Sequence, residues 1–212
     1  MPKSFSYVVA MTCPNITGLL LAAGLSRRMG SPKPLLDFQG KTAVTLCLEA
    51  MLNGGVGKVV LVTHPGLRLC LEALAKGLPV RVEMNPIPNS AMADSLRVGI
   101  KALKANTEGV LVHLVDHPLV KSQTIQTMAG VFHQNASQIV IPIFQEKKGH
   151  PVLLPMKYLR AFRPEETLKC LIKRFAKHVR FVELNDQGIL QDLDTPEVYL
   201  EAKEAFERPK DE

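Results

Sequence analysis

The feature that most limits the fold of this chain is a series of short apolar runs that do not alternate with polar residues. Runs of this length that are rich in Val, Ile and Leu indicate strands covered on both faces. These runs are Ile16–Ala23, Lys58–Thr63, Val80–Met84, Val110–Val115 and Ile139–Ile143.

Stretches with helical spacing lie between the runs. In the first of them Val44, Leu48 and Met51 mark one apolar face, and Gly54-Gly55 provides a C-terminal stop. The stretches are Thr42–Leu52, Leu67–Ala75, Ser95–Leu103 and Ser122–Phe132. Alternating strands and helices imply βαβ crossovers, so we expect an α/β fold: a three-layer, doubly wound αβα domain with a mainly parallel, Rossmann-like sheet.

The alternation loosens after Pro151, where the pattern predicts shorter elements. These are a strand at Val152–Leu154, helices around Tyr158–Phe162 and Leu168–Ala176, a strand at Val179–Leu184 and a helix from about Pro196. A chain of 212 residues that is 46% hydrophobic can bury the core of one sizeable domain, and no linker or repeat marks a second. We expect an N-terminal extension over residues 1–15, one domain over 16–206 and a tail over 207–212.

Composition narrows the class of ligand. The net charge of +6 suits an anionic ligand, but the absence of Trp and the spread of basic residues disfavour a nucleic acid. A small anionic substrate is therefore favoured. The four cysteines have no metal-ligand spacing and are interpreted as buried thiols in a reducing compartment: Cys13, Cys47, Cys70 and Cys170.

The apolar runs also bear on location. The N-terminal apolar stretch Tyr7 to Met11 is much shorter than that of a secretory signal, and no run approaches the ~20 residues that cross a bilayer. We expect a cytoplasmic protein without a membrane partner.

In an open parallel sheet, ligands bind beyond the carboxyl ends of the strands. The loop that follows the first run, from Gly24 to Pro34, contains two glycines, two serines and three cations, which suits phosphate oxygens. It matches neither a Walker A loop nor the dinucleotide-binding fingerprint. From composition alone, a solvated basic loop remains the alternative.

The string Leu-Ala-Ala-Gly-Leu-Ser-Arg-Arg-Met-Gly-Ser-Pro-Lys-Pro, from Leu21 to Pro34, resembles the signature of the nucleotidyltransferases that include the molybdenum cofactor cytidylyltransferases. The resemblance covers residues 16 to about 200 in the family's order. It continues in Asn85-Pro86, Ser95-Leu96 with Gly99, Asp116-His117-Pro118, Gly149-His150-Pro151 and Asp192-Leu193-Asp194-Thr195-Pro196.

The resemblance implies a nucleotide-diphospho-sugar transferase-like fold and transfer of a nucleotidyl group from an NTP to a small phosphorylated acceptor. Arg28 and Lys33 would bind the triphosphate and stabilise charge on the departing pyrophosphate, with Asp116 as the third catalytic residue. The implied nucleotide-binding residues are Leu21, Ala22, Ala23, Gly24, Ser26, Arg27, Arg28, Met29, Gly30, Lys33, Asn85, Ser95 and Asp116.

Ala23 bears on the choice of base. Related guanylyltransferases usually have Gly at this place, so the resemblance favours CTP over GTP, because an extra methyl would narrow the pocket toward a pyrimidine. A small residue here could equally serve strand-to-loop packing alone.

A magnesium site is expected at the same edge of the sheet. Asp116 ends a strand, and hard carboxylate oxygens suit Mg²⁺, which takes one or two protein carboxylates together with phosphate oxygens. The second carboxylate would be Asp194, with Asp192 as the alternative. A helix cap before Pro118 is the competing interpretation of Asp116.

Two of the six histidines, His117 and His150, belong to the ligand edge. The resemblance implies that His117, Gly149, His150 and Pro151 bind the acceptor. No general base is needed, because a phosphate monoester is already largely anionic at neutral pH.

The chain departs from the family at Ala91-Met92-Ala93-Asp94, where typical members have hydroxyl residues, and at Arg163–Thr167 on the acceptor side. The leading hypothesis is transfer of CMP from CTP to molybdenum-bound molybdopterin, with a molybdoenzyme or its chaperone as the partner that receives the product. The alternatives are GTP-dependent guanylylation of molybdopterin, a sugar or polyol phosphate acceptor, and a non-catalytic nucleotide-binding delivery module.

Overall fold

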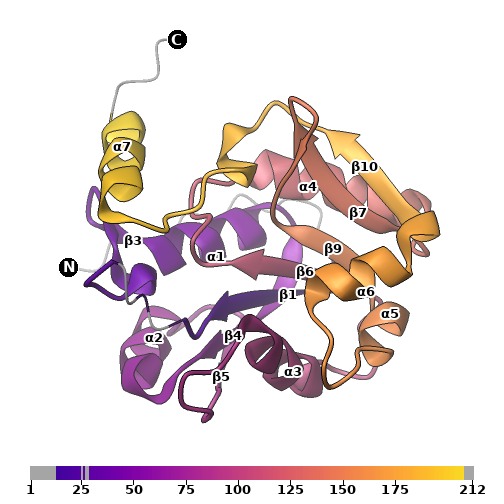
Figure 1. Ribbon diagram of the computed structural model, residues 1–212, viewed down its shortest axis with the longest axis horizontal. Helices are drawn as coiled ribbons and strands as arrows, with labels where there is room; N and C mark the ends of the chain where they lie inside the picture. Colours follow the sequence, from indigo (N-terminus) through magenta and orange to yellow (C-terminus); the bar gives the residue numbers. More distant parts are fainter. Residues whose placement is uncertain (1–12, 25, 27–28, 208–212) are drawn as a thin grey trace.

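An eight-stranded sheet forms the centre of the computed structural model, which describes residues 13–24, 26 and 29–207 (Figure 1). The strand order is β10-β7-β9-β6-β1-β4-β5, and β8 pairs with β7. The strands are β1 (Cys13–Ala22), β4 (Val56–Thr63), β5 (Val80–Met84), β6 (Gly109–Leu114), β7 (Ile139–Phe144), β8 (Lys147–Lys148), β9 (Val152–Pro155) and β10 (Val179–Glu183).

The sheet is mostly parallel. Strand β1 lies in its middle and pairs in parallel with β4 and β6, while β5 pairs in parallel with β4. Strand β9 is antiparallel to both β6 and β7, and β10 is parallel to β7. The carboxyl ends of β5, β4, β1 and β6 therefore lie along one edge, as the sequence predicts for a ligand-binding edge.

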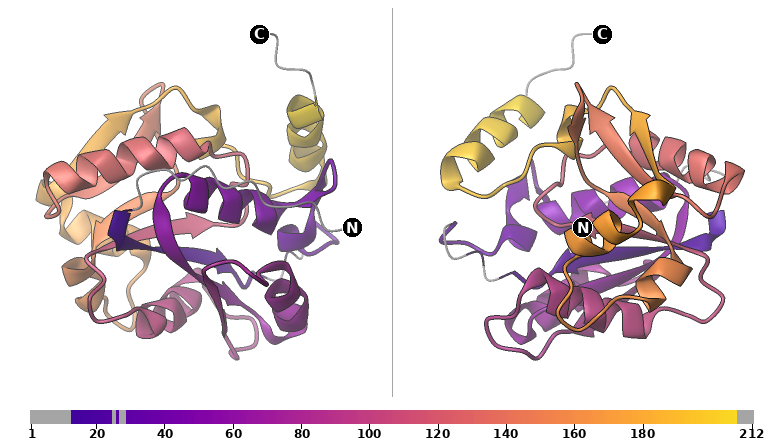
Figure 2. Two further views of the ribbon diagram at one scale, coloured as in Figure 1. Left: turned by 180° about the vertical axis from the view of Figure 1, so that it is seen from behind. Right: turned by 45° about the vertical axis from the view of Figure 1, so that its right-hand side comes forward.

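Helices cover both faces of the sheet, as Figure 2 shows. One face packs against α1 (Ala43–Asn53), α2 (Arg68–Leu74) and α4 (Ser122–Gln134), and the other against α3 (Met92–Ala102), α5 (Met156–Arg160) and α6 (Leu168–Arg174). Along β1, Leu20 belongs to the first cluster, whereas Leu19 and Leu21 belong to the second. Residues 18–22 of this strand have no polar side chain because both faces of the strand are covered here.

A third, smaller cluster lies outside these layers. The hairpin β2 (Asp37–Phe38) and β3 (Lys41–Thr42) packs against α7 (Pro196–Glu207), which stands apart from the sheet in Figure 1. The Phe38 ring meets the rings of Tyr199 and Phe206 edge-on, at centroid distances of 5.6 Å each. This packing ties the C-terminal segment to the region just after the first loop.

Four short 3-10 turns complete the structure. They are η1 (Lys33–Leu35), η2 (Pro65–Leu67), η3 (Ala176–His178) and η4 (Gln187–Ile189). Within the part of the chain that the structure describes, no helix has the length and apolar character needed to pass through a membrane.

The main differences from the sequence-based expectations concern β1, α3 and the cysteines. Strand β1 begins at Cys13 rather than near Ile16, and α3 begins at Met92 rather than Ser95. The prediction of buried cysteines was wrong for Cys70 and Cys170, which are exposed on α2 and α6. Both occur on the outer sides of short helices, where a few apolar neighbours in sequence do not imply burial. Cys47 is buried, and burial raises the pKa of its thiol.

Candidate nucleotide-binding site

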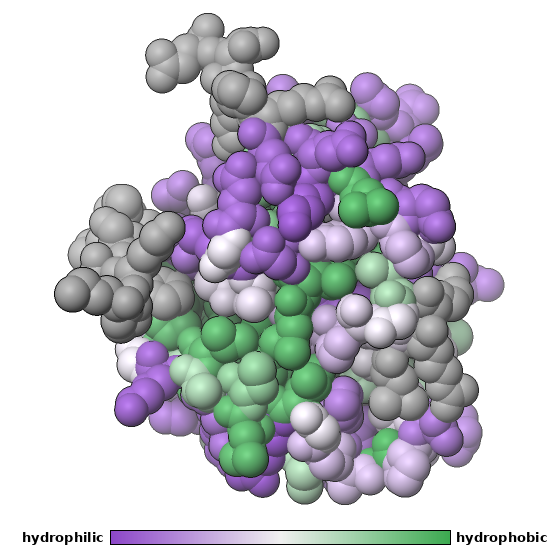
Figure 3. All heavy atoms as spheres, turned by 90° about the vertical axis from the view of Figure 1, so that its left-hand side faces the viewer, coloured by the Kyte–Doolittle hydropathy of each residue, from purple (hydrophilic) through white to green (hydrophobic). Residues whose placement is uncertain are grey.

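A cavity of about 250 Å³ lies at the edge where β1 and β6 end. Figure 3 looks toward this side of the molecule and shows an apolar area among hydrophilic surface. The wall is formed by the loop after β1, the start of α3, the end of β6 and the segment before α7. Its lining residues are Leu21, Ala23, Gly24, Ser26, Met29, Lys33, Ser90, Ala91, Met92, Ser95, Leu114, Val115, Asp116 and Asp194.

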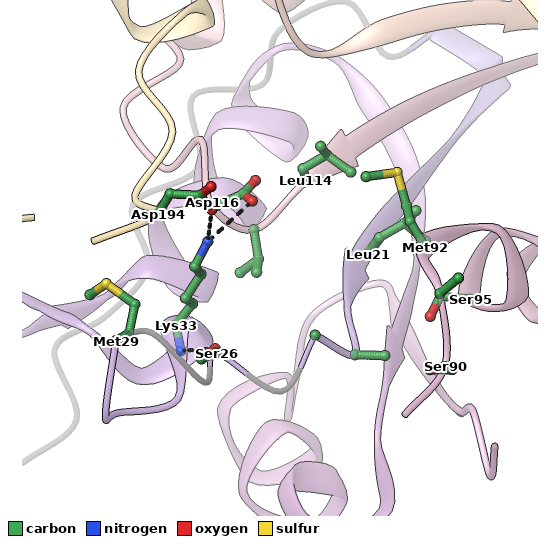
Figure 4. A pocket seen from close by; sticks show the side chains of 14 residues that line it. Leu21, Ser26, Met29, Lys33, Ser90, Met92, Ser95, Leu114, Asp116 and Asp194 are labelled. Carbon is green, nitrogen blue, oxygen red and sulfur yellow. Dashed lines mark hydrogen bonds and ion pairs between the residues drawn. The ribbon is translucent and has the colours of Figure 1, made fainter. Parts of the chain in front are cut away.

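The charged end of the cavity is a cluster of one lysine and two carboxylates (Figure 4). Lys33 Nζ donates to Asp194 Oδ1 at 2.6 Å and lies 3.5 Å from Asp116 Oδ2. The Lys33 side chain is 14% exposed, which restricts its solvation and makes the two carboxylates important partners. Lys33 thus meets carboxylates that lie 83 and 161 positions further along the chain.

Asp116 has a carboxylate oxygen that could bind a metal ion. Its Oδ1 is buried and makes no hydrogen bond, while its backbone oxygen accepts from Leu193 N at 2.9 Å and holds the segment before α7 in place. A buried carboxylate oxygen without a partner is costly unless a cation or water satisfies it. With Asp194 beside it, the donor set fits a hard divalent cation completed by phosphate oxygens and water.

Asp192, the alternative second carboxylate, is exposed and does not line the cavity. Of the two candidates, the structure brings only Asp194 into the wall beside Asp116. No group of three or more His, Cys, Asp or Glu side chains among the described residues is arranged to hold a metal ion. A cation at this place would therefore depend on oxygen atoms of the ligand.

The loop between β1 and η1 is held in shape by its own backbone. Ser26 has φ 50° and Gly30 φ 65°, so the chain turns through left-handed conformations that Gly adopts without strain. Ser26 Oγ accepts from Lys33 N at 2.9 Å, and Met29 N donates to Ser26 O at 2.9 Å. These bonds position the lysine. Arg27 and Arg28, which the sequence predicts to bind the triphosphate, lie outside the described residues.

The far end of the cavity is apolar. Figure 4 shows Leu21, Leu114 and Met92 on the side opposite Lys33, with Ser95 beyond them. Ala23 belongs to the wall and is 5% exposed. Ala22 and Gly30 were predicted to bind the nucleotide, but neither lines the cavity.

Asn85 holds the cavity residue Ser95 through a hydrogen bond. It is fully buried, its Nδ2 donates to Ser95 Oγ at 3.0 Å, and it does not itself line the cavity. Asp94 belongs to the segment in which the chain departs from the family, and it accepts hydrogen bonds from Ala91 N at 2.9 Å and from Arg97 Nη1 at 2.9 Å. Its carboxylate therefore caps α3, and this early cap explains why the helix begins at Met92.

The predicted acceptor residues lie beside the cavity without lining it. His117 Nε2 is 3.9 Å from Asp116 Oδ1, and the His117 and His150 rings have centroids 5.1 Å apart. The His150–Pro151 peptide bond is cis, and His150 N donates to Ile189 O at 2.9 Å. Any side chain at Gly149 would collide with Ile189 O, which explains the glycine.

Burial keeps these imidazoles neutral. It lowers the pKa of His150 to about 4, with a smaller contribution from His117. It also lowers the pKa of His117, against the opposing effect of Asp116. Nδ1 is buried without a hydrogen bond on both rings. The two histidines predicted to bind the acceptor are thus neutral imidazoles next to a charged cluster.

Sequence reasoning did not assign roles to several wall residues, namely Ser90, Ala91, Met92, Leu114 and Val115. Ser90 and Ala91 belong to the loop after β5 at the ligand edge, and Met92 is the first residue of α3. The position of this loop was the available signal. Leu114 and Val115 could not be found from residue type, because an apolar residue at a strand end usually packs in the core.

A family model decides the relationship. The model of the MobA-like NTP transferase domain matches residues 18–180. This chain belongs to the MobA-like NTP transferase domain family. The fold of the MobA-like domain is that of the nucleotide-diphospho-sugar transferases, and the expected fold class and family resemblance are confirmed.

Two curated relatives span nearly the whole MobA-like domain. This chain is 28% identical over 195 residues to nicotine blue oxidoreductase from Paenarthrobacter nicotinovorans, and the match covers 87% of this chain and 94% of the relative. It is 25% identical over 190 residues to molybdenum cofactor cytidylyltransferase from Escherichia coli K12, covering 89% and 95%.

Among solved structures, Rv0371c from Mycobacterium tuberculosis H37Rv has a TM-score of 0.74 and 26% identity, over 90% of this chain and 98% of that one. A structure of Rv0371c in complex with manganese has a TM-score of 0.71 and 24% identity, over 90% and 99%.

Proposed function

We propose that this MobA-like domain transfers CMP from CTP to molybdenum-bound molybdopterin and releases pyrophosphate. The observation that carries the proposal is the cluster of Lys33, Asp116 and Asp194 at one end of a cavity whose other end is apolar. The charged end suits the phosphates of a nucleotide, and the apolar end suits its base. Family membership supports the class of reaction.

Mg²⁺ is the proposed cofactor, and Asp116 and Asp194 are the residues that would hold it. Their fit rests on the unpartnered, buried Asp116 Oδ1 and on the neighbouring Asp194 oxygen that now contacts Lys33. The bound cation would supply a positive charge that neutralises phosphate oxygens. The manganese complex of Rv0371c supports a divalent ion in a protein of the same fold.

In the reaction, a phosphate oxygen of the acceptor forms a bond to the α-phosphorus of CTP, and the bond from that phosphorus to the bridging oxygen of pyrophosphate breaks. Lys33 stabilises the negative charge that develops on the departing pyrophosphate. Ser26 keeps the backbone of Lys33 in place through its 2.9 Å hydrogen bond. Arg28 is proposed as the second cation on the same loop.

The choice of CTP rests on the apolar end of the cavity. The methyl group of Ala23 belongs to the wall, and Leu21 and Met92 also line it. A side chain at this point reduces the space beside the base and favours a pyrimidine over a purine. GTP-dependent guanylylation of molybdopterin is the alternative.

The acceptor would lie on the side of His117 and His150. Both imidazoles are neutral at pH 7 because burial lowers their pKa values. They can therefore bind polar atoms of the acceptor without adding charge beside Asp116. A sugar or polyol phosphate is an alternative acceptor, because the chain departs from the family at Arg163–Thr167 on the acceptor side. In this segment Glu166 forms an ion pair with Arg174.

A second candidate function comes from the nicotine blue oxidoreductase relative. Redox chemistry in this cavity would require a nucleotide cofactor that carries a hydride, bound where CTP is proposed to bind. A non-catalytic module that delivers nucleotide or cofactor to a molybdoenzyme or its chaperone is the remaining alternative. It would bind CTP and produce no pyrophosphate.

The deciding experiment measures pyrophosphate release by the purified protein with each of the four NTPs, Mg²⁺ and molybdenum-loaded molybdopterin. We expect release with CTP that needs both the metal and the acceptor. A parallel assay follows oxidation of reduced nicotinamide dinucleotides in the presence of a dye. Dinucleotide oxidation without pyrophosphate release would replace the transferase with the reductase, and a preference for sugar phosphates would change the acceptor.

A further inference from the structure

A second cavity, of about 360 Å³, lies at the edge of the sheet opposite the nucleotide site. It is formed where β1, β4 and β5 begin and where α3 ends. The residues that line it are Thr17, Lys58, Val59, Val60, Leu78 and Val80, together with Pro79, Arg81 and five residues of 102–107. None of the roles proposed above uses this cavity.

The floor of the second cavity is apolar. Val59 and Val60 on β4 are buried, and Leu78, Val80 and Leu103 are partly buried around them. Water in contact with such a surface is readily displaced by an apolar group. The floor therefore suits the hydrocarbon or aromatic part of a ligand.

The rim is cationic. Lys58, Arg81 and Lys104 line the cavity and are exposed, and no Asp or Glu is among its described lining residues. Arg81 pairs with Glu83, but Lys58 and Lys104 make no ion pair within residues 13–24, 26 and 29–207. Two cations without a carboxylate partner thus flank an apolar hollow, whereas Lys33 in the nucleotide cavity is held between two carboxylates.

We propose that the second cavity is a binding site for a small amphipathic anion, with an apolar or aromatic body on the valine floor and a phosphate or carboxylate group between Lys58 and Lys104. Each half of the ligand is matched by a different part of the wall. A neutral apolar molecule or a bare anion satisfies only one half and binds more weakly.

Helix α3 connects this site to the nucleotide cavity. Ala91, Met92 and Ser95 at its start line the first cavity, and Ala102 at its end lines the second. In between, a side chain at Gly99 would collide with Leu19 on β1, so the helix lies directly against the strand. Occupation of the second cavity therefore alters the affinity for the nucleotide. This coupling rests on the proposed function, whereas binding of the anion to the second cavity does not.

The test of binding uses methyl NMR on the full chain, with 1-naphthyl phosphate and 1-naphthoate as probes. We expect saturable shifts of the Val60 and Val80 methyl signals that are larger than any shift transmitted to Leu21 or Met92. Inorganic phosphate and 1-naphthol should bind at least about tenfold more weakly, because each lacks one of the two contacts. Comparing the two naphthyl probes separates a phosphate ligand from a carboxylate ligand.

The variant Lys58→Gln/Lys104→Gln should weaken probe binding about tenfold, as expected for the loss of two exposed charge contacts. Its matched control is Lys169→Gln/Lys173→Gln, which removes two exposed lysines of α6 and should leave binding unchanged. Equal losses in both variants, or shifts confined to Leu21 and Met92, would overturn the proposal, as would equal binding of naphthol.

Coupling is measured as the change in the dissociation constant for CTP when the probe is saturating. We expect a change of about fivefold that disappears in the Lys58→Gln/Lys104→Gln variant. An unchanged constant would overturn the coupling through α3. Failure of CTP to bind at all would instead contradict the proposed function and leave the NMR result standing.

Discussion

The nucleotide cavity and the neighbouring acceptor side meet at Asp116, but they differ in how they would hold a ligand. The cavity has a charged end in which Lys33 contacts two carboxylates. The acceptor side has neutral, buried imidazoles, His117 and His150. On the proposed function, one edge of the sheet would bind two anionic substrates by different means, with fixed charges serving the nucleotide and neutral imidazoles serving the acceptor.

The strongest test of the charged side is Asp116→Asn. We expect a loss of about a thousandfold in the rate of pyrophosphate release, because the change removes the carboxylate charge that would hold the metal. The matched control is Asp192→Asn, which changes an exposed carboxylate outside the cavity. Equal losses in the two variants would contradict the choice of Asp194 over Asp192 as the second ligand.

Lys33→Met should lower the rate about a hundredfold, which corresponds to ~3 kcal/mol of transition-state stabilisation. Lys169→Met, at an exposed site on α6, serves as the control. Steady-state kinetics with varied CTP measure both variants. A Lys33→Met enzyme with normal turnover would remove Lys33 from the catalytic groups and weaken the contrast between the two sides.

The buried histidines lead us to expect that the free energy of unfolding depends on pH. His113, next to His117 and His150, is buried with no hydrogen bond on either ring nitrogen, and burial lowers its pKa well below the usual value. Since the pKa is lower in the folded state, the unfolded state binds more protons below pH ~6.5, and stability falls as the pH falls. Each such histidine contributes up to ~1.4 kcal/mol per pH unit.

His113→Leu should therefore reduce the loss of stability between pH 6.5 and 4.5, as measured by urea unfolding at a series of pH values. The control His133→Asn changes an exposed histidine on α4 and should leave the slope as it is. An unchanged slope in His113→Leu would show that His113 is not the source of acid sensitivity.

His150→Asn should raise the KM for the acceptor about tenfold, the effect of a lost hydrogen-bonding group, and leave the KM for CTP nearly unchanged. The activity should not follow a His150 titration near neutrality, because its pKa is about 4. His178→Asn, on the exposed η3 turn, is the control. A larger effect on CTP than on the acceptor would reverse the assignment of the two sides.

Ala23→Gly is the mildest change. We expect the preference for CTP over GTP to fall by roughly threefold, because the loss of one methyl group in an apolar pocket is worth ~1 kcal/mol or less. Competition between the two nucleotides in one assay measures the ratio. No change in the ratio would leave Ala23 with a packing role only.

Much of the fold could be predicted from the sequence. The apolar runs identified the five main strands, because a strand covered on both faces needs apolar residues at successive positions, as Leu19, Leu20 and Leu21 show. The antiparallel direction of β9 and the hairpin under α7 could not be predicted in this way. The pairing of β9 with β6 and the packing of the hairpin against α7 depend on contacts between segments far apart in the chain, such as Phe38 with Tyr199.

The candidate site could likewise be predicted only in part from the sequence. Through a family resemblance, the sequence predicted roles for Lys33, Asp116 and Asp194, and it left Asp192 as the alternative to Asp194. Only the tertiary structure separated the two carboxylates, because a turn of the chain places Asp194 2.6 Å from Lys33 and leaves Asp192 exposed. The roles of Arg27 and Arg28 stay predictions, because both lie outside the described residues.

By itself, the sequence determined which segments are strands and helices and which residue types gather at the ligand edge, because hydrophobic periodicity and turn residues act locally. The tertiary structure alone decided that Asp194 contacts Lys33, and that Lys58 and Lys104 flank a second apolar cavity. Such outcomes depend on distances between residues remote in sequence, which are fixed only when the helices pack against the sheet.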